Sequence, residues 1–204
     1  MRIRQHVNPL RADFLEIPLA PLHLPQERPV EVELGSAEAS FLQERAAEDP
    51  GRSYVGVELR RELVEQANRH CRQMGLDHVR SVFANISVDL PRLFSPRSVA
   101  RFFINFPDPW FKLRQHKRRV VGEELIAELD HLLVADGEIW VATDIFAIAL
   151  DAMAALEQAG GFRNLCEPWS FLRERRFVAR SRRERRCEEL GIKIWRLAYR
   201  RSGG

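Results

Sequence analysis

The stretch VEVELGSAEA at residues 30–39, followed by YVGVE at residues 54–58, decides the fold class. Both runs are rich in β-branched residues over five positions, which is typical of strands. Gly35 ends the first run and permits a tight turn, and residues 38–48 between the runs are predicted to form a helix. A strand, a helix and a strand in this order predict a βαβ unit, whose two strands run parallel.

The same alternation continues toward the C-terminus. Further strands are predicted at residues 78–83, 99–105, 137–143 and 193–199, and further helices at residues 60–74, 120–134 and 145–158. The first 28 residues contain four prolines and no periodicity, so we expect an extended lead-in there. The remainder, residues 29–204, is predicted to be one α/β domain with a mainly parallel sheet and helices on both faces.

The composition excludes several classes of protein. The chain has 204 residues, of which 45% are hydrophobic and 30% charged, and it is long enough to bury a core without disulfides. It contains no apolar run long enough to span a membrane, and its N-terminus lacks the apolar part of a secretion signal, so a cytoplasmic location and no membrane partner are expected. The three cysteines and six histidines show no metal-ligand spacing, so no metal is predicted.

The positive charge is concentrated in two segments. Residues 112–119 hold five Lys or Arg and no acid, and residues 173–186 hold eight Arg and two Glu. Because the net charge is only +3, the rest of the chain is acidic. An acidic body with two basic segments indicates that a polyanion such as RNA binds at one place. A solvated charged surface is the alternative interpretation.

Polar side chains follow the predicted strands where each strand ends. Ligands of such sheets bind at the edge formed by the carboxyl ends of the strands, which here carry Glu33, Glu58, Asn85, Asp108 and Asp144. An acid at the position of Glu58 can accept both hydroxyls of a ribose. The glycine patterns that bind diphosphates are absent, and Glu33 and Glu38 disfavour a diphosphate, so the turn favours the cationic sulfonium of S-adenosylmethionine. A nicotinamide cofactor and a purely structural turn are the alternatives.

The motif at residues 105–110 places an acid in rigid, aromatic surroundings. Asp108 lies between Pro107 and Pro109 and close to Phe106 and Trp110. Stacking on aromatic rings and hydrogen bonds to base edges hold an accessible nucleobase, and the basic run that follows can bind phosphates. A solvated aspartate in a proline-rich turn is the alternative.

The residues at 106–110, followed by Lys112, Arg114 and the run from His116 to Arg119, resemble the signature of the tRNA (guanine-N7-)-methyltransferase family. The segment at residues 5–10, Glu33-Leu34-Gly35, Thr143-Asp144 and the tail from Ser181 to Trp195 are similar to that family in order and spacing, so the resemblance covers nearly the whole chain. It implies a Rossmann-like class I methyltransferase fold with seven strands, the last antiparallel. It further implies S-adenosylmethionine as donor and N7 of a variable-loop guanosine, guanine-46 of tRNA, as acceptor.

The resemblance also assigns roles to individual residues. The positions that match the family's cofactor site are Glu33, Gly35, Glu58, Asn85 and Asp108, and Asp108 also matches its catalytic position. The positions that match its substrate site are Lys112, Asp144, Ser181, Arg182, Arg183 and Glu184. The remaining cations of the first basic run are candidate phosphate contacts: Arg114, Lys117, Arg118 and Arg119.

Five residues depart from the family pattern, and two of them, Gln115 and Cys187, stand where the family usually has His and Gly. Ala37 and Ala39 stand where the family has glycine, and a left-handed backbone at either position would strain alanine by about 1 kcal/mol or more. Arg183 stands in place of a phenylalanine. Two other functions therefore stay open: a methyltransferase acting on another RNA or a small molecule, and a non-catalytic RNA-binding protein with a degenerate cofactor turn. The sequence does not distinguish a monomer from a homodimer.

Overall fold

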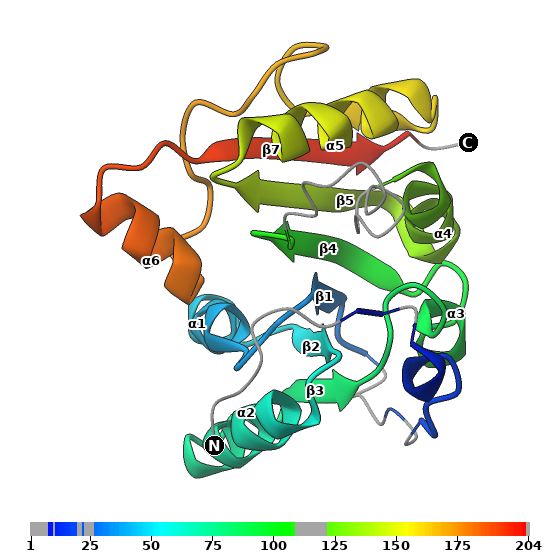
Figure 1. Cartoon of the computed structure of the whole chain (residues 1–204), viewed down its shortest axis with the longest axis vertical. Coiled ribbons are helices and arrows are strands. Elements are labelled where there is room, and N and C mark those ends of the chain that lie inside the picture. Colours follow the sequence, from blue (N-terminus) through cyan, green and yellow to red (C-terminus); the bar gives the residue numbers. More distant parts are fainter. Residues whose placement is uncertain (1–7, 10, 20–21, 23–26, 109–121, 203–204) are drawn as a thin grey trace.

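The computed structural model describes residues 8–9, 11–19, 22, 27–108 and 122–202, and these build one seven-stranded sheet (Figure 1). The strands are β1 (Val30–Leu34), β2 (Ser53–Glu58), β3 (Val79–Phe83), β4 (Val99–Asn105), β5 (Leu133–Thr143), β6 (Phe162–Asn164) and β7 (Trp195–Arg201). Their order in the sheet is β3-β2-β1-β4-β5-β7-β6. Strands β1 to β5 pair in parallel, whereas β7 is antiparallel to both of its neighbours. The mainly parallel sheet with an antiparallel last strand is thereby confirmed.

Helices cover both faces of this sheet, as predicted. One face carries α1 (Ser40–Glu48) and α2 (Arg61–Gln73), and the other carries α3 (Leu90–Leu93), α4 (Glu123–Leu132) and α5 (Phe146–Gln158). A sixth helix, α6 (Arg182–Glu189), precedes β7 and lies on the α1 side of the molecule (Figure 1).

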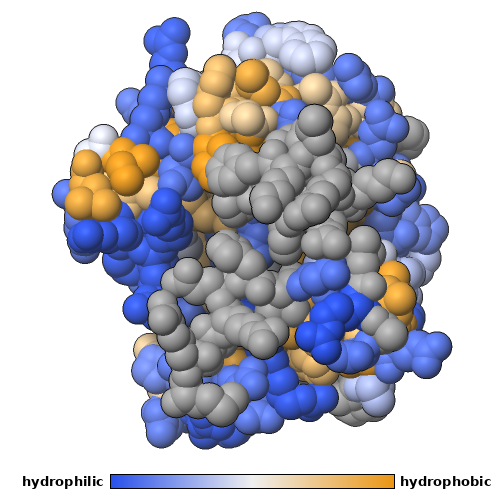
Figure 2. Space-filling model, in the orientation of Figure 1, coloured by the Kyte–Doolittle hydropathy of each residue, from blue (hydrophilic) through white to orange (hydrophobic). Residues whose placement is uncertain are grey.

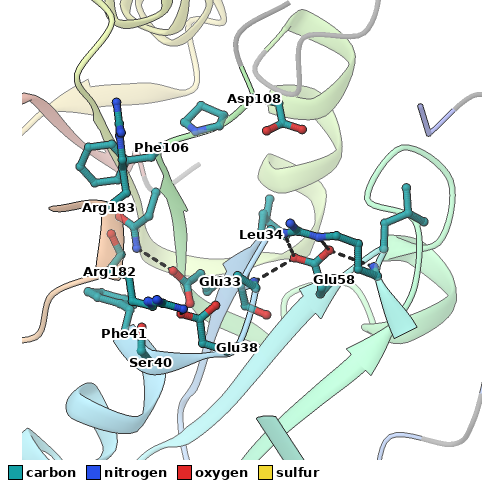
Figure 3. Close-up of a pocket in the computed structure, with 18 of the residues that line it drawn as sticks. Glu33, Leu34, Glu38, Ser40, Phe41, Glu58, Phe106, Asp108, Arg182 and Arg183 are labelled. Carbon is teal, nitrogen blue, oxygen red and sulfur yellow. Dashed lines mark hydrogen bonds and ion pairs between the residues drawn. The ribbon is translucent and has the colours of Figure 1, made fainter. Parts of the chain in front are cut away.

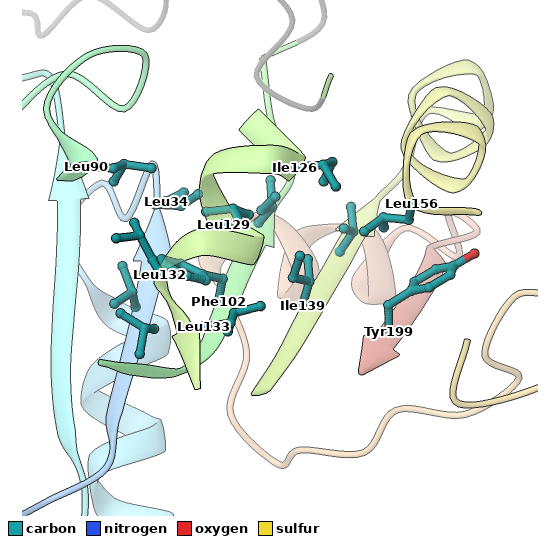
Figure 4. Packing of buried hydrophobic residues seen from close by; sticks show 14 of the residues in the cluster. Leu34, Leu90, Phe102, Ile126, Leu129, Leu132, Leu133, Ile139, Leu156 and Tyr199 are labelled. Carbon is teal, nitrogen blue, oxygen red and sulfur yellow. The ribbon is translucent and has the colours of Figure 1, made fainter. Parts of the chain in front are cut away.

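The larger hydrophobic core lies between the sheet and helices α4 and α5 (Figure 4). Alternate strand residues such as Leu34, Phe102 and Ile139 point into it, and Leu129 and Leu132 of α4 pack against them, all five being buried. Because successive strand side chains point to opposite faces, this pattern turns the intervening residues toward α1.

Those intervening residues include a ladder of charges across four strands. Glu31 of β1 is fully buried and lies in register with Arg101 of β4, which faces Glu138 of β5, which in turn faces Arg200 of β7. Arg101 donates to both Glu31 and Glu138, and Arg200 donates to Glu138 at 2.8 Å. Arg45 of α1 adds two hydrogen bonds to Glu31 Oε2, of 3.1 and 3.2 Å. Opposite charges thus neutralise one another at every step of the ladder.

The structure differs from the sequence prediction in several elements. Helix α4 ends at Leu132, and β5 begins at Leu133 rather than at residue 137, because the buried Leu133 side chain joins the core and its backbone pairs with Val99 of β4. A 3-10 helix at Ala12–Phe14 interrupts the expected extended lead-in.

Three further elements, α3, β6 and α6, lay outside the prediction. The first two span only three or four residues, and α6 lies within the arginine-rich segment. Among the described residues, no helix is both long and apolar enough to cross a membrane.

Replacing Glu31 by glutamine should strongly destabilise the fold. The change leaves Arg45 buried beside an uncharged partner, and breaking a buried ion pair in this way costs about 3 kcal/mol or more, or roughly 6–12 °C in the unfolding midpoint of a domain of this size. The matched control is Asp13→Asn, since the Arg11–Asp13 pair is half exposed and should contribute little. Thermal unfolding of the two variants tests this, and equal midpoints would contradict it.

Candidate active site

A cleft of about 1020 Å³ opens at the carboxyl ends of the parallel strands (Figure 3). It brings together most of the predicted site residues, namely Glu33, Gly35, Glu58, Asn85, Asp108, Asp144, Ser181, Arg182 and Arg183. Glu184 is absent from its lining, because that side chain is buried and paired with Arg196 at 2.6 Å. The predicted contacts Lys112, Arg114, Lys117, Arg118 and Arg119 lie outside the described residues.

Glu33, the fourth residue of β1, is a buried carboxylate with one free oxygen. Its Oε1 accepts a hydrogen bond of 2.9 Å from Asn105 Nδ2, whereas its Oε2 is buried without a partner. Burial, together with the nearby charges of Glu38 and Glu58, raises the pKa of Glu33 to about 8, although the Asn105 bond opposes the shift. An unpaired buried carboxyl oxygen facing a cleft is suited to a cationic ligand, which would complete its hydrogen bonding.

Glu58, the last residue of β2, is held by four hydrogen bonds. Its Oε1 accepts from the backbone N–H and the Nε of Arg60, at 2.9 and 2.8 Å, and its Oε2 accepts from the Ala37 N–H at 2.9 Å and from Arg60 at 2.8 Å. These bonds raise the pKa of Arg60. The two backbone donors fix the carboxylate at the edge of the cleft, and the Arg60 side chain occupies its other two acceptor positions.

The turn between β1 and α1 runs close to β2. A Cβ on Gly56 would lie 2.3 Å from Ser36 Oγ, so this glycine permits the turn to pack onto the strand. Within the turn, Gly35, Ala37 and Ala39 all have left-handed backbones, with φ of 78°, 47° and 58°. Alanine is strained in this conformation, and both alanines of the turn adopt it.

Asp108 lies on the opposite side of the cleft from Glu33 and Glu58 (Figure 3). Phe106 precedes it in a left-handed conformation with φ of 50°, and the Phe106 N–H donates to the Ala142 carbonyl at 2.7 Å. Left-handed phenylalanine is uncommon and is further disfavoured before proline, as here before Pro107. Strained backbone of this kind clusters at functional sites, where it fixes a neighbouring side chain.

Asn85 ties the N-terminal segment to the cleft. Its Nδ2 donates to the carbonyls of Pro9 and Phe14 at 2.9 and 3.0 Å, and its Oδ1 accepts from the Ser87 N–H at 3.0 Å. Pro9 thereby becomes part of the cleft wall. Both amide hydrogens of Asn85 are used within the chain, so this residue shapes the wall.

The arginine-rich segment faces acidic partners. Ser181 caps α6 by accepting the Glu184 N–H at 3.1 Å, Arg182 pairs with Glu38 at 3.1 Å, and Arg183 pairs with Asp144. Both arginines are more than half exposed at the mouth of the cleft. The positive charge is therefore fixed where the cleft meets solvent.

Arg60 and Asn105 are site residues that the sequence analysis did not assign. Asn105 ends β4 on the same face of the sheet as Glu33, since both strands alternate with period two. That register could have identified it. Arg60 follows β2 by two residues, and nothing in the sequence distinguishes it from the other arginines.

A parallel sheet with a reversed last strand and an acidic cleft at its carboxyl edge defines the class I methyltransferases. The chain has this fold in common with a 16S rRNA methyltransferase, KamB, with a TM-score of 0.61 and 13% identity over 87% of this chain and 89% of that one. A family model described as "Putative methyltransferase" matches residues 27–197.

The particular family is given by closer relatives. A tRNA (guanine-N(7)-)-methyltransferase of Synechococcus sp. (strain JA-3-3Ab) is 37% identical over 96% of this chain and 84% of its own length. One from Thermosynechococcus vestitus is 33% identical over 98% and 95%. The chain belongs to the tRNA (guanine-N(7)-)-methyltransferase family, which confirms the resemblance found in the sequence.

Replacing Ala37 by glycine should stabilise the protein. Glycine adopts a left-handed backbone without the strain that alanine suffers, which is about 1 kcal/mol, or roughly 2–4 °C in the unfolding midpoint. The matched control is Ala147→Gly in the exposed first turn of α5, where the same change should lower the midpoint. Thermal unfolding that gave the same sign at both positions would contradict the role of backbone strain.

Replacing Glu33 by glutamine should change how stability depends on pH. Because the folded-state pKa of about 8 exceeds the ordinary value of 4.5, folding favours the protonated acid, and the wild type loses up to about 1.4 kcal/mol per pH unit between these values. Glutamine is neutral throughout, so the variant should match the wild type near pH 4.5 and exceed it increasingly toward pH 8. Denaturant unfolding from pH 5 to pH 8.5 measures this. A difference that did not vary with pH would show that Glu33 is ionised across the range.

Proposed function

We propose that this protein transfers a methyl group from S-adenosylmethionine to N7 of a guanine in tRNA, and that the guanine is the variable-loop nucleotide at position 46. The observation that carries the proposal is the cleft itself. Its buried end is acidic, with Glu33, Glu58 and Glu38, and its mouth carries exposed arginines. One end suits a cationic methyl donor and the other suits a polyanion.

The residues at the buried end fit the donor. The partnerless Oε2 of Glu33 is matched by an ammonium group, which supplies N–H donors and a positive charge. An acid at this position accepts ribose hydroxyls in such folds, so a bound ribose would take the acceptor positions on Glu58 that the Arg60 side chain now occupies. Gly35 leaves open space beside the turn, since a Cβ there would meet no atom within 4 Å. When bound, S-adenosylmethionine supplies a methyl group activated by its sulfonium.

The chain's own residues would act by positioning and by charge. Guanine N7 carries a free lone pair, so the reaction needs no general base, and orientation supplies the main catalytic effect. Methylation at N7 makes the purine cationic. Asp108, fixed by the strained backbone at Phe106, would accept hydrogen bonds from the N1 and N2 edge and stabilise that positive charge.

The mouth of the cleft, where the exposed arginines lie, would hold the RNA. Asp144 is oriented by Arg183, and a guanidinium that is half exposed can contact phosphate while it keeps this carboxylate in place. The basic run at residues 112–119 directly follows the Asp108 motif in sequence, which supports its assignment to phosphate contacts.

Replacing Asp108 by alanine should lower methyl transfer about 100-fold or more, because a group aimed at the developing charge is lost, while tRNA binding stays nearly unchanged. Asp77→Ala is the control, since Asp77 is exposed and precedes β3 at the opposite edge of the sheet. The assay uses labelled S-adenosylmethionine, unmodified tRNA and chemical cleavage at N7-methylguanosine.

The position of the label decides among the functions. Label at guanine-46 supports the proposal, and label at another nucleotide would redirect it to a different RNA site. Bound tRNA without transfer would identify a non-catalytic RNA-binding protein. Equal rates for the Asp108 and Asp77 variants would remove Asp108 from the mechanism.

A further inference from the structure

Three aromatic rings from distant parts of the chain meet beside the cleft. Phe146 begins α5, Phe171 lies between β6 and α6, and Trp195 begins β7. The centroid of the Trp195 ring lies 4.5 Å from that of Phe146 and 4.9 Å from that of Phe171, and the two phenylalanine centroids are 6.2 Å apart. We call this group the aromatic shelf.

The shelf continues the wall of the cleft. Asp144 and Ile145 line the cleft, and Phe146 is the next residue. Because β7 is antiparallel to β5, Trp195 pairs with Thr143 at the carboxyl edge of the parallel strands. The topology thus brings the start of the last strand to the edge where the ligand binds.

Part of the shelf is open to solvent. Phe146 is 47% exposed, and Leu150, one helical turn farther along α5, is 42% exposed. Figure 2 shows hydrophobic atoms gathered on the surface over α5. An exposed phenylalanine directly beside a binding cleft indicates a contact surface.

The charge around the shelf indicates which partner it fits. Lys193 is exposed, and its Nζ lies 3.8 Å from the centroid of the Trp195 ring. Aromatic faces bordered by cations are typical of surfaces that bind unpaired nucleotides, since bases stack on the rings and phosphates meet the charges. Protein–protein interfaces, by contrast, are depleted in lysine.

We propose that the aromatic shelf stacks an unpaired tRNA base that neighbours the guanine held in the cleft. The inference rests on the proposed function, because it takes the cleft to hold the target base. Phe146 supplies the exposed ring, Trp195 and Phe171 support it from behind, and Lys193 meets the phosphate. The shelf is a positioning element that keeps the flanking nucleotide from restacking on the target.

The test compares Phe146→Ala with Phe146→Trp. Loss of one stacking ring should raise both the Kd for tRNA and the KM about tenfold without changing kcat, and tryptophan should restore both values. Met74→Ala is the matched control, since Met74 is 53% exposed and directly follows α2, at the opposite end of the sheet. Thermal unfolding of each variant confirms that it is folded.

The outcomes separate this inference from the proposed function. If the wild type methylates tRNA and Phe146→Ala keeps the wild-type KM, the shelf has no such role and the function stands. If the wild type binds tRNA without methylating it but the alanine variant binds tenfold more weakly, the aromatic shelf contacts tRNA and the proposed function fails. A change in oligomeric state by sedimentation in the alanine variant alone would identify the shelf as a contact between copies of this chain and would overturn the inference.

Discussion

Two glutamates on one face of β1 differ in whether arginines neutralise their charge, and the organisation of the molecule depends on that difference. Glu31 is neutralised by arginines from α1 and β4, whereas Glu33, two residues closer to the carboxyl edge, has only the amide of Asn105. The sheet alternation forces both carboxylates into the same buried layer. The first glutamate therefore joins elements of the fold, and the second keeps an unsatisfied oxygen at the cleft.

The two arginines that neutralise Glu31 also contact the basic segment before β7. Arg45 and Arg101 lie under the ring of Phe177, whose centroid is 4.5 and 5.2 Å from their guanidinium carbons. The backbone that follows is anchored to α1, because the N–H groups of Ala179 and Arg180 donate to Glu48 and Glu44. Acids on α1 thus hold the segment in place, while Arg182 and Arg183 remain exposed at the cleft mouth.

Periodicity and glycine positions were sufficient to predict every strand except β6, and the edge where the site lies. Strands β1 and β4 match the predicted bounds. In β1 the alternating pattern did not predict burial, because Glu31 and Glu33 are buried as well as Val32 and Leu34. The resemblance to a known family then selected the candidate residues, and the cleft contains those of them that the structure describes, with the exception of Glu184. Ser181 and Glu184 lie three residues apart, which is a capping signal, yet in the sequence they were interpreted as substrate contacts.

What the sequence could not show depends on contacts between distant segments. The link from Asn85 to Pro9 and the contact of Phe146 with Trp195 leave no local pattern. Arg60 and Glu58 are only two residues apart, yet nothing in the sequence distinguishes Arg60 from the other arginines. The left-handed backbone at Phe106 could not be predicted from the sequence either, because only tertiary contacts impose a conformation that local preference opposes.

The position of β7 has a consequence for how the protein is made. This strand is the last of the described elements, yet it lies between β5 and β6, and among the described strands β6 pairs with β7 alone. Because β7 follows the other six strands in sequence, the sheet can close only after they have all been made, and Trp195 meets Phe146 and Phe171 in the same step. The acids of α1 precede the arginine-rich segment in sequence, so they are made before those arginines, whereas Trp195 follows them. The aromatic shelf is therefore completed only when β7 pairs with β5, after both the arginine-rich segment and its acidic partners on α1 have been made.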